Sequence, residues 1–109
     1  MANYKLKVKL GLKWLEKSTY EATVTVTTTD SCFHAGELTI GLPPGEVGIP
    51  ETEYLTFAFT HTGEICSDIV RDVTKSIKIT SSAGKTNVTA FATVDGKVAG
   101  QDTKPFPRG

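Results

Sequence analysis

The sequence has no long apolar run, no excess charge of either sign and no stretch rich in helix-forming residues. Its apolar runs cover only a few residues, whereas a membrane-spanning helix needs roughly 20, so the sequence predicts no membrane insertion. Lysine plus arginine and aspartate plus glutamate number 12 each, so no overall field attracts nucleic acid or an anionic membrane. A binding surface must therefore be sought in a local patch.

The motifs of common enzyme families are missing as well. There is no nucleophile elbow and no recurrent pair of carboxylates, and the glycines near the prolines do not form a phosphate-binding loop at a strand-to-helix junction. Histidine in general titrates near neutral pH, which makes His34 and His61 candidate acid–base groups, but acid–base catalysis also needs a positioned nucleophile or paired acids. The sequence predicts a protein that is not an enzyme and that uses no cofactor.

Threonine is abundant, and glycine and proline are spread along the whole chain, which favours β structure. The clearest strand covers residues 20–27, where apolar and polar residues alternate without a break. A period of two is that of a strand with one buried face, so we expect this segment to be a central strand. Its apolar side consists of Tyr20, Ala22, Val24 and Val26.

Six further segments have the length and patterning of strands. Residues 4–14 carry apolar side chains at even positions, and Asp95-Gly96 predicts a hairpin because both residues accept the positive φ of a type I′ turn. The other expected strands are residues 37–42, 54–61, 74–80, 86–94 and 97–101. Seven such strands predict a single domain over residues 1–109 with an all-β, seven-stranded antiparallel immunoglobulin-like sandwich. A closed barrel and a small α+β fold are the alternatives.

The connecting segments carry further expectations. Residues 43–50 contain three prolines and predict a long surface loop between the two sheets. Residues 65–73 predict a short helical turn at most, and residues 104–109 predict a tail that frays at its end. Because loops present the binding residues of sandwiches, residues 43–53 and 30–36 are the expected interaction surfaces, unless they merely connect strands.

The two cysteines, Cys32 and Cys66, each follow an expected strand. A disulfide between them would close a loop of about 35 residues, which stabilises the fold by about 3–4 kcal/mol. Two buried free thiols are one alternative. A metal site is the other, because the histidines near the cysteines would complete a Cys₂His₂ set, although the spacing matches no zinc pattern that we can justify. Its ligands would be Cys32, His34, His61 and Cys66.

The cysteines also bear on the compartment. Disulfides persist in oxidising environments, so the disulfide interpretation favours a periplasmic or extracellular location. The first residues lead directly into an alternating strand, so no secretory leader is present in the sequence shown. An exported protein whose leader was removed and a cytoplasmic protein are both compatible with this observation.

Lysines form a basic row along the polar face of the first expected strand. Such a row can receive an acidic partner, but lysines on an outer strand also prevent edge-to-edge aggregation and cover apolar surface with their stems. No aromatic residue lies among them to stack on bases, so we expect a protein partner rather than nucleic acid. We also expect a monomer or a dimer paired through sheet edges. The row consists of Lys5, Lys7, Lys9 and Lys13.

Two segments carry a family resemblance. Residues 20–33 alternate valine and threonine up to Ser31-Cys32, and residues 74–107 form a strand, turn, strand, Asp-Gly hairpin and proline-ended tail. These segments resemble the CsgC-type curli-assembly family, which are small periplasmic immunoglobulin-like sandwiches that restrain amyloid formation. The sequence departs from that family at Cys32-Phe33-His34, where a Cys-x-Cys pair is expected.

Three functions follow from these observations. The residues themselves predict a non-catalytic interaction or structural module. The resemblance implies an amyloid-suppressing chaperone of the curli type. The cysteines and histidines leave a small metal-binding domain as the third expectation.

Overall fold

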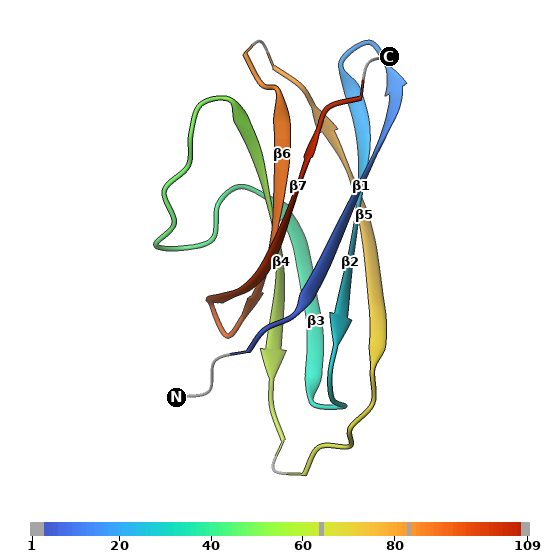
Figure 1. The fold of residues 1–109 in the computed structure, drawn as a ribbon, viewed down its shortest axis with the longest axis vertical. Helices are drawn as coiled ribbons and strands as arrows, with labels where there is room; N and C mark the ends of the chain where they lie inside the picture. The colour runs from blue at the N-terminus through green and yellow to red at the C-terminus, as the bar shows by residue number, and fades with distance from the viewer. Residues whose placement is uncertain (1–3, 64, 83, 108–109) are drawn as a thin grey trace.

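Seven strands in two facing sheets make up the computed structural model, which describes residues 4–63, 65–82 and 84–107. One sheet has the order β1-β2-β5 and the other β3-β4-β6-β7 (Figure 1). The described residues contain no helix, and therefore none long and apolar enough to cross a membrane. The strands are β1 (Lys7–Glu16), β2 (Thr19–Thr28), β3 (Phe33–Ile40), β4 (Thr52–His61), β5 (Arg71–Thr80), β6 (Asn87–Val94) and β7 (Lys97–Pro105).

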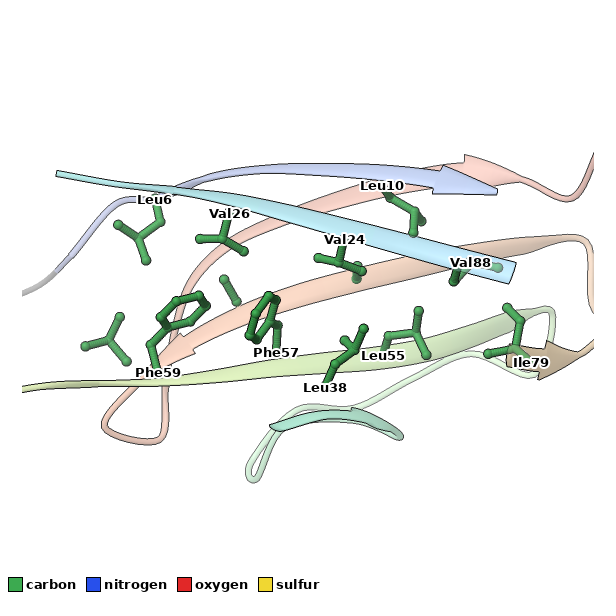
Figure 2. Packing of buried hydrophobic residues seen from close by; sticks show 14 of the residues in the cluster. Leu6, Leu10, Val24, Val26, Leu38, Leu55, Phe57, Phe59, Ile79 and Val88 are labelled. Carbon is green, nitrogen blue, oxygen red and sulfur yellow. The ribbon is translucent and has the colours of Figure 1, made fainter. Parts of the chain in front are cut away.

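The core lies between the two sheets. Val24 and Val26 of β2 point toward the other sheet, where Leu55 and Phe57 of β4 point back at them (Figure 2). Each fully buried side chain of this kind stabilises the fold by about 1.5–3 kcal/mol. The largest fully buried side chains are Phe57, Phe59, Leu10, Leu55, Val24, Val26 and Val88.

The alternation of residues 20–27 is confirmed as the pattern of a central strand. β2 lies between β1 and β5, and its even-numbered residues face the core. The Asp-Gly hairpin is confirmed too, because Asp95 has a φ of 50° and Gly96 a φ of 84° between β6 and β7. Local pattern and turn chemistry therefore agree with the structure here.

The expected all-antiparallel pairing is wrong for one pair, because β4 and β6 are parallel from Thr52↔Asn87 to Phe59↔Val94. The chain leaves β4 for the opposite sheet, returns along β5 and then enters β6. Two successive reversals give β6 the direction of β4, and such a parallel pair needs a crossover connection. Here β5 and its two flanking loops are that crossover.

The proline-rich loop does not pass between the sheets, because β3 and β4 are antiparallel neighbours in one sheet. β3 also begins at Phe33, within the predicted turn, and a bulge between Ala35 and Leu38 corrects its register. Residues 65–70 contain no helical turn. A hydrogen bond of 2.9 Å from the Ser31 amide to the Ser67 carbonyl ties this segment to the β2–β3 connection.

The C-terminal segment, which was expected to fray, is paired over most of its length. β7 extends to Pro105, and the Phe106 ring packs 4.8 Å from the ring of Tyr20. Tyr20 Oη also donates a hydrogen bond of 3.1 Å to the Pro107 carbonyl. Residues 108–109 lie outside the described residues.

Charged side chains on the inner faces of two edge strands close the gaps between the sheets. Asp102 of β7 accepts a hydrogen bond of 2.8 Å from the Leu10 amide of β1. On the opposite side, Lys75 Nζ of β5 donates to the Gly36 carbonyl of β3 at 2.7 Å. Inward-pointing charges at sheet edges are a known protection against pairing with other chains.

We expect Asp102→Ala to lower the free energy of unfolding by about 1–3 kcal/mol, because it leaves the Leu10 amide without its acceptor. Urea denaturation would measure the loss. Asp68→Ala removes an exposed carboxylate and serves as the control, with an expected change within about 0.5 kcal/mol. Equal effects of the two substitutions would show that Asp102 does not seal this edge.

Candidate functional site

Four side chains with metal-ligating or titratable groups meet at one end of the sandwich. Asp30 and Cys32 come from the β2–β3 connection, His61 ends β4, and Cys66 lies in the β4–β5 loop. This is the lower end in Figure 1. One donor atom from each of the four lies within 4.8 Å of the others.

The sulfur atoms of Cys32 and Cys66 lie 2.03 Å apart, the distance of a disulfide bond. Cys32 is buried, whereas Cys66 is partly exposed. Gly63 makes room for the pair, since a Cβ at this residue would approach Cys32 Sγ to 2.7 Å. Its φ of +131° also favours glycine. The bond ties the β4–β5 loop to the start of β3.

His61 has both ring nitrogens occupied. Its Nε2 lies 3.0 Å from each carboxylate oxygen of Asp30, and its Nδ1 lies 3.1 Å from Tyr4 Oη. An ionised carboxylate only accepts hydrogen bonds, so Nε2 donates to Asp30; whenever the ring is neutral, Nδ1 then carries no proton and accepts from the Tyr4 hydroxyl. The Phe33 ring meets the His61 ring edge to face at 4.6 Å and fixes its orientation.

The hydrogen bond from His61 holds the pKa of the Asp30 carboxyl below its usual range. Partial burial opposes this shift, and the hydrogen bond of 2.8 Å from the Cys32 amide reinforces it. Asp30 is therefore ionised at neutral pH and joins the histidine to the cysteine backbone. It acts as the hub of this cluster.

The structure brings together three of the four residues of the expected metal set. Cys32, His61 and Cys66 meet. In β3, Phe33 pairs with His61, and the next residue, His34, pairs with Thr60 and is exposed. Asp30 takes the fourth place, and sequence reasoning missed it. The signal was its position two residues before Cys32, which allows its side chain to accept from the Cys32 amide.

Three members of the lysine row, Lys7, Lys9 and Lys13, lie on the outer face of the three-stranded sheet, and Lys5 precedes β1. All four lysines are exposed, and Lys7 and Lys9 pair with Thr27 and Thr25 of β2. Beside these lysines, threonine side chains of β2 form hydrogen bonds with side chains of β5. Thr25 Oγ1 lies 2.9 Å from Thr74 Oγ1, and Thr27 Oγ1 donates to Asp72 Oδ1 at 2.7 Å. The strand thus presents positive charge beside a polar surface.

An apolar cleft of about 380 Å³ lies beside the same strand, where β1 and the end of β7 separate. At the other end of the strand the two edges meet, with a bond of 2.8 Å from the Leu6 amide to the Ala99 carbonyl. Among the described residues, β1 forms a backbone ladder with β2 alone. The cleft is lined by Leu10, Gly11, Leu12, Lys104, Pro105 and Pro107.

The β3–β4 loop, residues 41–51, presents aliphatic side chains to solvent, and two of its backbone amides are hydrogen-bonded to Tyr54. Val47 is 94% exposed and Ile49 56% exposed. The Gly41 amide donates to the Tyr54 carbonyl at 2.8 Å, and the Ile49 amide donates to Tyr54 Oη at 2.9 Å. Tyr54 therefore anchors both ends of the apolar part of the loop.

We expect alkylation without reductant to modify no thiol in the native or the denatured protein, because both cysteines are in the disulfide. Reduction should lower the free energy of unfolding by about 3–4 kcal/mol, since the bond closes a loop of about 35 residues in the unfolded chain. Intact mass and urea denaturation measure these effects. Two alkylated cysteines in the unreduced, denatured protein would contradict the disulfide.

Comparisons with known proteins do not assign a family. No protein-family model matches the chain, and neither the curated proteins nor the solved structures that were searched contain a match.

Proposed function

We propose that this protein is a non-catalytic binding module that engages a protein partner through its β3–β4 loop. The exposed aliphatic side chains of this loop carry the proposal. Isolated exposed apolar residues are common on proteins, but several on one loop are a feature of interaction surfaces. They are Ile40, at the end of β3, and Leu42, Val47 and Ile49.

The hydrogen bonds that tie the loop to Tyr54 support the same proposal. A loop that is already held in place loses less conformational entropy on binding than a disordered one. Tyr54 Oη accepts a hydrogen bond from the Ile49 amide of the loop. Gly48 lies so close to the Tyr54 ring that an added Cβ would come within 2.5 Å of it. The aliphatic side chains are thus displayed from a fixed base.

The architecture and the disulfide support the remaining parts of the proposal. A division into three and four strands is compatible with an immunoglobulin-like sandwich, of which the parallel β4–β6 pair would be a variant. A disulfide is compatible with an oxidising compartment, and we place the protein in the periplasm or outside the cell. No cofactor is assigned to it, and the partner is a protein rather than nucleic acid or membrane.

We expect the double variant Val47→Ser, Ile49→Ser to bind its partner with an affinity about 10-fold to 100-fold lower, because two aliphatic side chains are no longer buried from water in the complex. The immobilised variant and the wild type would be compared by quantitative mass spectrometry of proteins retained from an extract of the source organism's exported proteins. Thermal unfolding should stay unchanged, since both side chains are exposed.

Ile65→Ser is the matched control, because Ile65 is 93% exposed but lies on the β4–β5 loop at the other end of β4. Proteins that depend on the β3–β4 loop should remain bound to this variant. Retention of the same proteins by the double variant, or equal loss with Ile65→Ser, would refute the assignment to the β3–β4 loop.

A second candidate function is suppression of amyloid assembly in the manner of curli-type chaperones. The observation that favours it is the lysine row beside the apolar cleft, where the edge of β1 past Leu10 has no neighbouring strand among the described residues. An unpaired strand edge can add an extended chain as a further strand, and the lysines would steer an acidic chain toward it. Such a chain is what an acidic amyloid-forming protein offers before it aggregates.

We expect the wild type to lengthen the lag time of an acidic amyloid-forming protein at low salt, and Lys7→Gln with Lys9→Gln to remove most of that effect. Thioflavin fluorescence measures the lag time, and added salt should weaken the effect because it screens exposed charges. Lys17→Gln with Lys78→Gln removes the same charge from other exposed positions and is the control. Unchanged lag times with a molar excess of wild type would exclude this function.

A further inference from the structure

We propose that reduction of the Cys32–Cys66 disulfide turns this end of the sandwich into a zinc site. The ligands would be the two cysteine thiolates, His61 Nε2 and a carboxylate oxygen of Asp30, whose donor atoms already lie within 4.8 Å of one another. Thiolate, imidazole and carboxylate are the three ligand types that Zn²⁺ takes in proteins. The inference does not depend on which partner the β3–β4 loop binds.

The spacing of the donor atoms suits a tetrahedral ion. With bonds of about 2.0–2.3 Å, neighbouring ligand atoms of a tetrahedral zinc site lie about 3.3–3.8 Å apart. His61 Nε2 and the Asp30 oxygens are 3.0 Å apart, so a shift of a few tenths of an ångström admits the ion between them. The two sulfur atoms can move apart once the bond between them is broken.

The surroundings of His61 match those of a metal-bound histidine. A ligating histidine commonly donates its other ring N–H to an oxygen, which fixes its tautomer and orientation. Tyr4 Oη lies 3.1 Å from Nδ1 and is placed for this role. When Nε2 binds zinc, the ring proton moves to Nδ1, and Tyr4 changes from donor to acceptor without moving.

Hydrogen bonds keep Cys66 near Cys32 in the absence of the disulfide. The Ser31 amide donates to the Ser67 carbonyl, and the Ser67 amide donates to Ser31 Oγ, each at 2.9 Å. The Thr62 amide donates to the Cys32 carbonyl at 3.0 Å. None of these bonds involves sulfur, so they can hold the two cysteines near each other when the disulfide is reduced.

The redox step balances with a dithiol as the reductant. The dithiol gives two electrons and two protons to the disulfide and becomes a disulfide itself, while Cys32 and Cys66 become thiols. Zn²⁺ then displaces the two thiol protons and binds two thiolates. The oxidised protein has no thiolate to offer, so zinc binding reports the thiol state of the chain.

Cobalt titration tests the proposal. The protein would be reduced with a water-soluble phosphine, freed of it without oxygen and titrated with Co²⁺. We expect thiolate-to-cobalt charge-transfer absorption and tetrahedral d–d bands that saturate at one ion per chain and disappear when Zn²⁺ is added. The oxidised protein should show neither. A reduced protein that gives no thiolate charge-transfer band would overturn the proposal.

Matched variants assign the ligands. Asp30→Ala and His61→Ala should each weaken Co²⁺ binding by more than about 10-fold, and Tyr4→Phe by about 10-fold or more. His34→Ala should bind like the wild type, because His34 lies outside the cluster. Equal loss with His34→Ala and Asp30→Ala would overturn the ligand set.

If the reduced chain unfolds without metal, circular dichroism tests the proposal instead. Zn²⁺ should then restore the β-sheet signal, since metal binding is coupled to folding. A reduced chain that stays unfolded in zinc would also overturn the proposal. Tyr4→Phe keeps the aromatic packing of the site and remains informative if the alanine variants fail to fold.

Discussion

The packing of β2 against β4 and β6 is the contact on which the rest of the structure depends. Val24 and Val26 meet a layer of aromatic and aliphatic side chains that includes Phe57 and Val88, and all of them are removed from water. Because the side chains of a strand alternate, burying one face of β2 sends Thr23, Thr25 and Thr27 to the outer surface. The hydroxyl surface and the neighbouring lysine row are thus consequences of the core.

Two open sides remain when two sheets face each other, and this protein closes them with charge. Asp102 and Lys75 both extend from the inner faces of edge strands to the backbone of the opposite sheet. The closure is incomplete beside the C-terminal end of β7, where the apolar cleft lies. The two surfaces that we propose for binding are the edge of β1 at this cleft and the projecting β3–β4 loop.

The cluster at the end of β4 joins stability to chemistry. The disulfide restrains the longest connection between the sheets, and the hydrogen-bond chain from Tyr4 through His61 to Asp30 fixes the side chains around it. In our proposal, these contacts also hold the four donor atoms together when the disulfide is reduced. Loss of the disulfide would thus leave a site that can bind zinc.

The sequence by itself determined the number of strands, the buried face of β2 and the Asp95-Gly96 hairpin, because these follow from local periodicity and turn chemistry. Only the tertiary structure decided that β4 and β6 are parallel, since strand order depends on crossings between sheets that no local pattern encodes. The tertiary structure also places Asp30, and not the expected His34, in the cluster with Cys32, His61 and Cys66. The reason is that a register fixed by the β3–β4 pairing turns His34 outward, while a long-range contact brings Asp30 to His61.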